Sequence, residues 1–375
     1  MRAPVDVAIV GGGVVGCACA RAAALAGLRV AVYEAGRVGA GATAAAMGHL
    51  VTIDDDPAEF ALARLSMKLW RAWSGWHAIE RRTTGTLWLA ESALQRDAAH
   101  AKLGRLRAAG LSAEWLEPDV LHGAEPRLAR DLVGALRVAG DEVAYGPELA
   151  ARLAADVRAA GGTVHEMHPV AGLRDDGLLL ADGRHVAAGH VLLAAGCDTV
   201  RLWSGDTPLP LRPRKGQLII TDRHPGYIRH ALVELGYIDS AHGDVDEAVA
   251  FNAQPRASGQ LLLGSSRSYR DTSPDVDVAL LARMLRRARR FLPDVAALQM
   301  LRCWAGFRPA IADGRPAIGR IPGARDNHWV AAGHEGLGLT TATGTASVWL
   351  DLLLGRTPAI DPAPYAPERF ARETA

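Results

Sequence analysis

A glycine-rich turn near the N-terminus constrains the fold of this chain more than any other feature. Gly11, Gly13 and Gly16 have the Gly-x-Gly-x-x-Gly spacing, with a β-branched run, 5–10, before them and an Ala-rich segment, 14–26, after them. This order predicts a buried parallel strand, a tight turn and a helix. The first glycine permits the turn, the second lets a pyrophosphate approach the backbone, and the third lets the helix pack close to the strand.

A second strand and an acidic residue complete this βαβ unit. Residues 28–33 form the predicted strand, and Glu34 follows at its end. A carboxylate there can accept hydrogen bonds from both ribose hydroxyls and would repel a 2′-phosphate. The helix N-terminus would present backbone N–H groups to the phosphates. We therefore predict a site for the ADP half of a dinucleotide, the alternative being a glycine turn that holds no ligand.

A further glycine-rich loop follows Glu34 directly. It spans residues 36–48 and contains Gly41, Thr43 and Gly48, with His49 next to it. The glycine motif alone does not distinguish FAD from NAD. A long cofactor whose second half lies across this loop explains the loop better than a nicotinamide does, so we expect FAD.

Composition and charge limit the other function classes. The chain has 375 residues, 49% of them hydrophobic, which suits two domains or one large two-part fold. Its net charge of +1 disfavours nucleic acid and anionic membranes as partners. The apolar run 18–26 contains Arg21 and is too short to span a bilayer, so we expect no stable membrane insertion. The four cysteines have no CxxC spacing, which favours a reduced, cytoplasmic protein without a metal site.

The order of predicted elements indicates an α/β fold with a discontinuous dinucleotide domain. Parallel βαβ material lies at the start, near 145–200 and at the end, whereas the middle has the alternation typical of antiparallel strands. We predict a Rossmann-like FAD-binding domain and a mostly antiparallel α+β substrate domain. The first comprises residues 1–80, 144–205 and 310–375, and the second comprises 81–143 and 206–309.

Two local predictions concern helices. Residues 60–78 are expected to form one helix in which Trp70, Trp73 and Trp76 pack into the core rather than against a cofactor. The basic cluster within 283–290 alternates with apolar residues at helical spacing, which favours a solvated helix face over a partner-binding patch. A strand is expected over 164–170.

Several segments together resemble the D-amino-acid oxidase-like flavoenzymes, the family that includes glycine oxidase, sarcosine oxidase and the D-amino-acid dehydrogenases. The resemblance covers nearly the whole chain. Its pieces are the Gly11–Gly16 turn with Glu34, the loop 39–48, the strand-to-glycine segment 192–196, Trp304-Ala-Gly-Phe-Arg308-Pro with the residues up to 319, and 332–344. The resemblance implies FAD in a Rossmann-like domain beneath an antiparallel substrate domain.

The resemblance also implies roles for individual residues. Arg308 would hold the substrate carboxylate, as suits a guanidinium that forms two parallel hydrogen bonds; the alternative is a structural arginine paired with an acid. The turn 333–338 would carry the pyrimidine side of the flavin, and Val170 would meet the adenine. The predicted cofactor-binding residues are Gly11, Gly13, Val14, Val15, Gly16, Glu34, Ala35, Arg37, Gly41, Ala42, Thr43, Gly48, His49, Val170, Ala195, Gly196, Arg308, Gly333, His334, Gly336, Leu337 and Gly338.

A narrower similarity connects residues 211–220, 232–242 and 249–256 with the flavin subunit of bacterial D-hydroxyproline dehydrogenases. It implies D-hydroxyproline or D-proline as the substrate. The family's usual pocket tyrosine, three positions before the proline of the last segment, is Asn252 here. Alongside Arg308, the predicted catalytic residues are His49, Asn252 and Tyr237, and the further pocket candidates are Glu234, His242 and Gln254.

The expected reaction transfers a hydride from the α-carbon of a D-amino acid or cyclic secondary amine to flavin N5 and gives an imino acid. His49 is a candidate acceptor of the amine proton, with a packing histidine as the alternative. Two other functions stay open: an FAD-dependent 2-hydroxy-acid dehydrogenase, and a flavin subunit that works only with electron-transfer partner subunits.

Lys215 and Cys303 could carry other chemistry. Lys215 is expected to be a charge at a strand end rather than a catalytic amine. Cys303 invites a covalent flavin, but the position of the family's linking cysteine, counted back from Asp313, falls on Gly306. We therefore expect FAD to be bound non-covalently.

Overall fold

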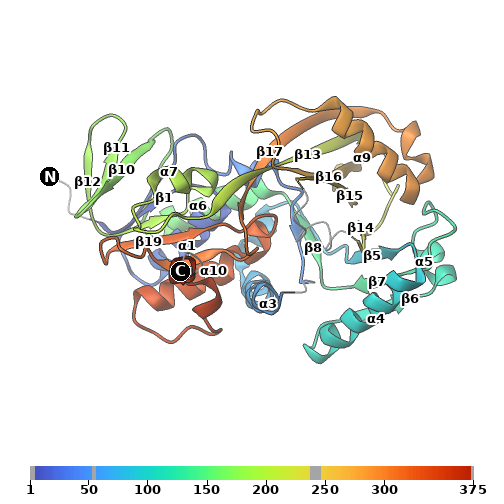
Figure 1. Ribbon diagram of the computed structural model, residues 1–375, viewed down its shortest axis with the longest axis horizontal. Helices are drawn as coiled ribbons and strands as arrows, with labels where there is room; N and C mark the ends of the chain where they lie inside the picture. The colour runs from blue at the N-terminus through green and yellow to red at the C-terminus, as the bar shows by residue number, and fades with distance from the viewer. Residues whose placement is uncertain (1–4, 53–55, 237–245, 373–375) are drawn as a thin grey trace.

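The computed structural model describes residues 5–52, 56–236 and 246–372, which form two lobes (Figure 1). Each lobe contains an eight-stranded sheet, and a small three-stranded sheet is also present. Parallel and antiparallel strands occur together, so the predicted α/β class is confirmed. Both chain ends lie on the first lobe (Figure 1).

The first sheet is parallel at its centre. Strand β1 pairs in parallel with β2 on one side and with β12 on the other, and β12 pairs in parallel with β19. The N-terminal and C-terminal parts of the chain thus share one sheet. Its strands are β1 (Val5–Val10), β2 (Val30–Tyr33), β9 (Thr163–His165), β10 (Val170–Arg174), β11 (Gly177–Leu180), β12 (His185–Leu193), β18 (Ala317–Arg320) and β19 (His328–Ala332).

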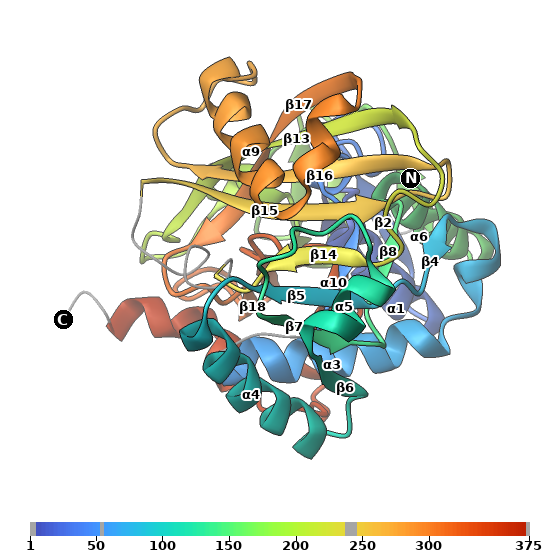
Figure 2. The same ribbon diagram turned by 90° about the vertical axis from the view of Figure 1, so that its right-hand side faces the viewer.

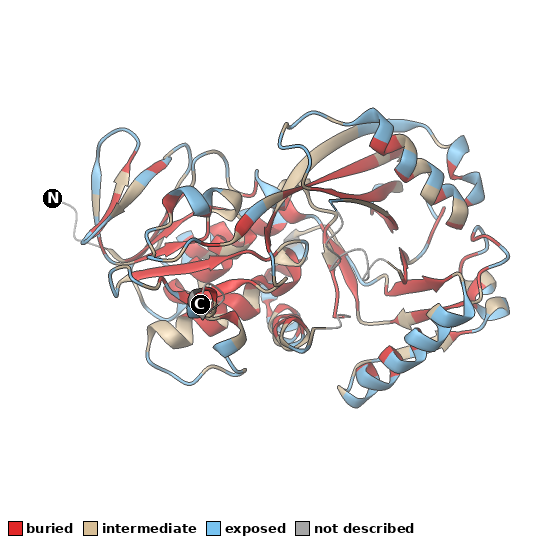
Figure 3. Ribbon diagram, in the orientation of Figure 1, coloured by how far each residue is buried: buried red, intermediate tan, exposed pale blue. Residues whose placement is uncertain are grey.

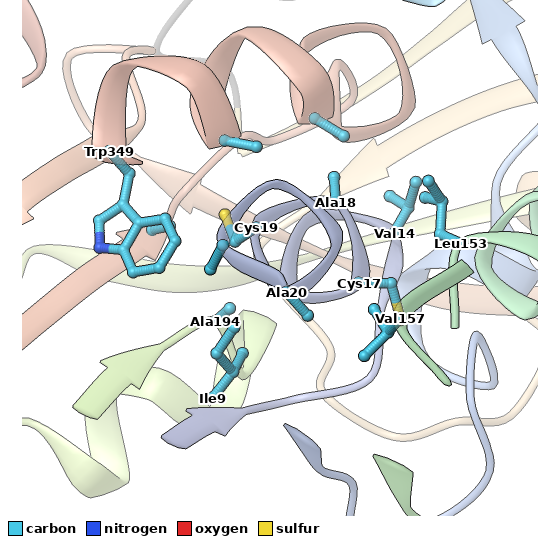
Figure 4. Packing of buried hydrophobic residues seen from close by; sticks show 14 of the residues in the cluster. Ile9, Val14, Cys17, Ala18, Cys19, Ala20, Leu153, Val157, Ala194 and Trp349 are labelled. Carbon is cyan, nitrogen blue, oxygen red and sulfur yellow. The ribbon is translucent and has the colours of Figure 1, made fainter. Parts of the chain in front are cut away.

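Helix α1 (Val14–Leu25) is buried at the centre of this lobe. It packs against α6 (Gly146–Ala159) and α10 (Gly338–Leu353), and α10 in turn packs against α3 (Pro57–Ala72). Figure 4 shows α1 end-on, with Ile9 of β1 beneath it and Trp349 of α10 beside it. Cys17 and Cys19 are free thiols without solvent exposure, so they are part of the core. Burying one large apolar side chain stabilises the fold by about 1.5–3 kcal/mol.

The second sheet is mostly antiparallel, and β14 pairs in parallel with β5. Helices α4 (Ala93–Ala108), α5 (Pro118–Ala124) and α9 (Val278–Phe291) lie on its outer side (Figure 2), where exposed residues concentrate (Figure 3). Its strands, in spatial order, are β17 (Met300–Ile311), β13 (Leu211–Arg223), β16 (Gln260–Ser268), β15 (Glu247–Pro255), β14 (Ala231–Glu234), β5 (Thr86–Ala90), β7 (Gly134–Val138) and β6 (Ala113–Leu116).

The small sheet places His49 between the lobes. It consists of β3 (His49–Leu50), β8 (Glu142–Ala144) and β4 (Arg81–Arg82). The remaining short helices are α2 (Ala42–Ala45) and α7 (Thr199–Leu202). The strands of the first sheet lie within the predicted FAD-binding segments, but the domain boundaries themselves stay a prediction.

Two local predictions were wrong. The expected strand 164–170 is two strands, β9 and β10, separated by a turn in which Met167 has a φ of 58°. The N–H groups of Met167 and His168 donate to the carbonyls of Gly36 and Glu34, so the loop after β2 holds this turn. Such a tertiary contact is invisible to local sequence patterns.

The expected helix 60–78 ends at Ala72. Trp73 is extended, and residues 74–78 form a short 3-10 turn. The backbone N–H of Trp73 and the indole N–H of Trp76 both donate to the carbonyl of Trp70, which ends the helix. All three tryptophans are buried, so their predicted core packing is right although they do not share one helix face.

Arginines of the basic cluster on α9 form ion pairs. Arg287 pairs with Glu234 and Glu91, and Arg283 pairs with Glu247. Among the helices described, none is long and apolar enough to cross a membrane.

Candidate active site and cofactor cleft

A cavity of about 610 Å³ is lined by residues of both lobes, and most of the predicted cofactor-binding residues are among them. Gly16, Arg37 and Gly333 do not line it. The predicted residues that do are Gly11, Gly13, Val14, Val15, Glu34, Ala35, Gly41, Ala42, Thr43, Gly48, His49, Val170, Ala195, Gly196, Arg308, His334, Gly336, Leu337 and Gly338.

The glycine turn is set by close backbone contacts. Gly11 has a φ of 110°, and a Cβ there would lie 2.4 Å from the carbonyl oxygen of Ala194. A Cβ on Gly16 would lie 2.0 Å from the carbonyl oxygen of Gly11. Gly16 therefore lets α1 pack against the turn rather than lining the cavity, which is the role expected of the third glycine.

Glu34 is fixed at the end of β2. Its Oε2 accepts a hydrogen bond from the N–H of Gly12 at 2.6 Å, and its Oε1 accepts one from Gly36 at 2.8 Å. Nearby, the Thr43 hydroxyl accepts from the N–H of Val14 at 3.1 Å and so ties α2 to the start of α1. The first turn of α1 carries no acidic residue, so no carboxylate of its own offsets the positive end of its dipole, as suits an anionic ligand.

The opposite end of the cavity is formed by the turn before α10. The His334 Nε2 lies 2.9 Å from the Thr345 hydroxyl oxygen. Burial lowers the pKa of His334 to about 4, so its imidazole is neutral at physiological pH. The N–H of Glu335 donates to the carbonyl of Pro309 at 3.0 Å, which attaches this turn to β17. The cavity is thus lined by the starts of two helices, α1 and α10, whose N–H groups suit the two halves of FAD.

Arg308 projects from β17 into the cavity. Its Nη1 donates to the carbonyl of Ser266 at 3.0 Å, and its Nε lies 3.7 Å from the Glu335 carboxylate. On the neighbouring strand the guanidinium passes over Gly216, where a Cβ would lie 2.3 Å from Nη1. Arg308 thus lines the cavity while part of its charge is shared with an acid, and its role in holding a substrate carboxylate stays a prediction.

His49 lines the cavity from the small sheet. Its Nε2 lies 2.8 Å from the Thr86 hydroxyl oxygen. Burial lowers the pKa of His49 to about 3, so the ring is neutral and its protonated form is disfavoured in the buried site. Asp141 lies close by, with its carboxylate 3.4 Å from the Thr52 hydroxyl. Burial raises the pKa of Asp141 to about 7, against the opposing effect of hydrogen bonds from Thr86 and Thr52.

Two buried polar side chains in the cavity fit a polar ligand. Asn252 is 5% exposed and Ser265 is 1% exposed. Within the described parts of the chain, neither the Asn252 Oδ1 nor the Ser265 Oγ has a hydrogen-bond partner. Because an unpaired buried polar atom costs free energy, both atoms suit a bound molecule that supplies the missing bonds.

Other candidates fall elsewhere. Glu234 pairs with Arg287, and neither Glu234 nor Gln254 lines the cavity. Tyr237 and His242 lie outside the described residues.

Two further expectations concern β13 and β17. Lys215 forms an ion pair with Asp271, but it lies within β13 and its side chain is buried, so the expected strand-end position was wrong. Gly306 lines the cavity and packs against Ala45, where a Cβ would lie 2.3 Å from the Ala45 Cβ.

Several charged and aromatic residues of the cavity were not predicted. Arg214, Arg267, Tyr269 and Glu335 all line it. The available signal was the alternation along β13, in which Arg212, Arg214, Gly216 and Leu218 all line the cavity.

The cavity is lined on one side by a dinucleotide-binding turn and on the other by an antiparallel sheet that carries arginines. This arrangement is typical of flavin-dependent oxidoreductases. The chain belongs to the FAD dependent oxidoreductase family, whose model matches residues 6–352. It is an enzyme of this family, and its cofactor is FAD.

Comparisons with individual proteins agree. The chain is 30% identical to a glycine oxidase of Bacillus licheniformis over 95% of its own length and 94% of the relative's. It is 31% identical to a D-amino acid dehydrogenase of Cereibacter sphaeroides over 78% of its length and 66% of the relative's. The crystal structure of glycine oxidase from Geobacillus kaustophilus matches with a TM-score of 0.84 and 29% identity, covering 97% of this chain and 98% of the other. L-proline dehydrogenase from P. horikoshii shares the fold, with a TM-score of 0.90 at 22% identity over 100% of this chain and 99% of the other.

Proposed function

We propose that this enzyme oxidises the α-carbon of a D-amino acid or a cyclic secondary amine to an imino acid. The observation that carries the proposal is Arg308, a guanidinium that lines the cavity next to the turn 334–338. A guanidinium binds a carboxylate through two parallel charged hydrogen bonds and keeps its charge at any physiological pH. It would therefore fix the substrate by its α-carboxylate at the cofactor end of the cavity.

The neighbouring residues suit the rest of an amino acid. The Asn252 amide oxygen can accept a hydrogen bond from the amine, and the Ser265 hydroxyl can bond to a polar group of the side chain. His49 is the candidate acceptor of the proton that the amine must lose before oxidation, a role that requires the bound substrate to offset the low pKa that burial gives this ring. When bound, FAD supplies the two-electron acceptor for the hydride that leaves the α-carbon. Water then hydrolyses the imino acid, or a cyclic imine is released if the substrate is a proline.

D-Hydroxyproline and D-proline are the first substrates that we propose. The support is the similarity of segments 211–220, 232–242 and 249–256 to D-hydroxyproline dehydrogenase flavin subunits. Because the relatives include a glycine oxidase and a D-amino acid dehydrogenase, we also propose glycine and other D-amino acids as substrates to be tested.

The test is anaerobic mixing of the FAD-loaded enzyme with D-hydroxyproline, D-proline, glycine and sarcosine in turn. At least one should bleach the flavin absorption band, whereas its 2-hydroxy-acid counterpart should not. An Arg308→Met variant that retains FAD should lose the bleaching by amines. If the band persists with every amine in the panel, amine oxidation is the wrong reaction.

Three finer proposals accompany this one. We propose that FAD is bound non-covalently, because the position that matches the family's linking cysteine is Gly306. Acid precipitation should then release the flavin into solution. We also propose a cytoplasmic location, to be tested by cell fractionation, and electron-transfer partner subunits. An isolated chain that turns over fully with an artificial acceptor would argue against an obligatory complex.

A further inference from the structure

Three buried polar atoms on the cavity face of the second sheet have no hydrogen-bond partner within the described chain. They are the Nε1 of Trp88, the Oδ1 of Asn252 and the Oγ of Ser265, and all three residues line the cavity. These residues are only 3%, 5% and 1% exposed. An indole N–H only donates, an amide oxygen only accepts and a hydroxyl does both. Because an unpaired buried polar atom costs free energy, these atoms indicate a ligand that supplies the missing hydrogen bonds.

The three residues follow one line across neighbouring strands. Asn252 of β15 lies opposite Val233 of β14, which in turn lies opposite Trp88 of β5. On its other side Asn252 pairs with Gly264 of β16, which directly precedes Ser265. Val233 also lines the cavity, between Asn252 and Trp88. Neighbouring strands lie about 4.8 Å apart, so Ser265 is about one strand spacing from Asn252, and Trp88 is about two spacings further on.

The carboxylate position proposed above adjoins one end of this line. The Arg308 Nη1 donates to the carbonyl of Ser266 at 3.0 Å, and Ser266 follows Ser265 on β16. A substrate carboxylate on Arg308 thus starts beside Ser265, and a side chain that crosses the sheet from there meets Asn252 next. The four side chains that form the line are uncharged, and burying a charge against uncharged groups is costly. An uncharged polar group suits them instead.

We infer that the enzyme selects amino acids whose side chain carries an uncharged hydrogen-bonding group, a hydroxyl or a primary amide. Ser265 and Asn252 bind the group of a short side chain, and Trp88 binds that of a longer one. A hydroxyl and an amide both donate and accept, which matches the atoms on the line. The Asn252 oxygen has two lone pairs, so it can accept from the substrate amine and from the side chain together. This inference rests on the proposed amine oxidation and narrows its substrate class.

Pairs of substrates with nearly equal shape test the inference. D-Threonine is compared with D-valine, D-asparagine with D-leucine, and D-hydroxyproline with D-proline, by kcat/KM of the FAD-loaded wild-type enzyme. In at least one pair the polar member should exceed the apolar one by about tenfold or more, because the apolar member leaves buried polar atoms unpaired. Equal values in every pair, or higher values for the apolar members, overturn the inference even if the amines bleach the flavin.

A variant of Asn252 identifies the residue responsible. Asn252→Leu removes the polar atoms of the amide at nearly constant shape. It should lower kcat/KM for the preferred polar substrate by about tenfold or more and change that for its apolar partner by less than about threefold. Without substrate the variant should melt at a higher temperature than wild type, since it removes an unpaired buried atom. A residue with a structural hydrogen bond would show the opposite change in melting temperature.

Gln254→Met is the matched control. Gln254 lies two positions after Asn252 on β15 and is fully buried, and both polar atoms of its amide are unpaired in the part of the chain that the structure describes. It does not line the cavity, so this change should leave the preference between the paired substrates unaltered. If Asn252→Leu lowers both substrates equally or lowers FAD content, the amide serves the cofactor or the backbone and the inference is wrong.

A binding measurement tests the same position without a variant and without oxidation. Succinamate and 4-methylpentanoate have nearly the same shape and one carboxylate each, and neither carries an amine. Each is titrated into the FAD-loaded wild-type enzyme while the flavin spectrum is recorded, and succinamate should bind at least about tenfold more tightly. Equal dissociation constants, or tighter binding of 4-methylpentanoate, contradict the inference. If succinamate is preferred but no amine in any panel bleaches the flavin, the polar position stands and the proposed oxidation fails.

Discussion

Replacement of Gly216 by alanine should disable the carboxylate clamp without unfolding the protein. Gly216 lies on β13, and a Cβ there would lie 2.3 Å from Nη1 of Arg308 and 2.7 Å from its Cζ and Nη2. The atoms in the way are the far end of a flexible side chain, not backbone. The guanidinium can therefore withdraw at small cost to the free energy of unfolding.

The size of that withdrawal sets the expected effect. Non-bonded heavy atoms are comfortable at about 3.5 Å, so the guanidinium has to retreat by about 1 Å. A misplacement of about 1 Å in a positioning group can lower the rate about a hundredfold. We expect Gly216→Ala to reduce kcat/KM by about that factor, with FAD content and melting temperature close to wild type.

The assay compares kcat/KM of Gly216→Ala with wild type, using the best amino acid from the substrate panels. Gly104→Ala is the control, because Gly104 lies within α4 and a Cβ there meets no atom within 4 Å. That change should leave activity unchanged and stabilise the helix by about 0.5–1 kcal/mol. If Gly216→Ala keeps kcat/KM within about threefold of wild type, Arg308 does not hold the reacting carboxylate from this position.

Three further outcomes are expected. Gly48 has a φ of 90°, and a Cβ there would lie 1.9 Å from the Ala144 carbonyl oxygen, so Gly48→Ala should cost at least about 1–3 kcal/mol in chemical denaturation. Gly41→Ala in the same loop, with no atom within 4 Å of its Cβ, should be near neutral, and similar losses in both would contradict the clash. Because burial raises the pKa of Asp141 to about 7, its carboxyl holds its proton more tightly in the folded than in the unfolded state, and stability is lost as pH rises from about 4 to about 7. Asp141→Asn should flatten that decline in melting temperature, and an unchanged decline would rule out Asp141 as its source. If His49 takes the amine proton, His49→Phe should lower kcat by about a hundredfold or more, measured as the anaerobic rate of flavin bleaching; an unchanged rate would leave His49 a packing residue.

The parts of the fold that the sequence predicts well are those with local causes. The strand Val5–Val10 was predicted with its observed bounds because a β-branched run and a glycine turn delimit it. The break between β9 and β10 was missed because its cause is not local: residues 167 and 168 donate to carbonyls at 36 and 34. The early end of α3 has a local cause, because the Trp76 indole donates to the Trp70 carbonyl six residues before it, but the spacing of the tryptophans does not reveal that hydrogen bond.

The cofactor side of the site was likewise easier to predict than the substrate side. The glycine turn and Glu34 lie in one continuous βαβ unit, so the spacing of these residues in the sequence predicts their positions in the site. On β13 every second residue from Arg212 to Leu218 lines the cavity, but the charge of Lys215 next to Arg214 obscures that alternation in the sequence. Only the register with β17 and β16 separates Arg214, which lines the cavity, from Lys215, which pairs with Asp271.

Glu335 connects the two sides of the site. Its backbone N–H binds β17 through Pro309, its carboxylate receives the guanidinium groups of the substrate sheet, and the residues after it line the cavity up to the start of α10. If Arg308 binds the substrate acid as proposed, that acid competes with Glu335 for the same guanidinium. Charge in the substrate pocket and the position of the turn beside the cofactor would then be linked through one side chain. Glu335 therefore belongs to the site through its contact with Arg308, although a carboxylate cannot itself bind a substrate carboxylate.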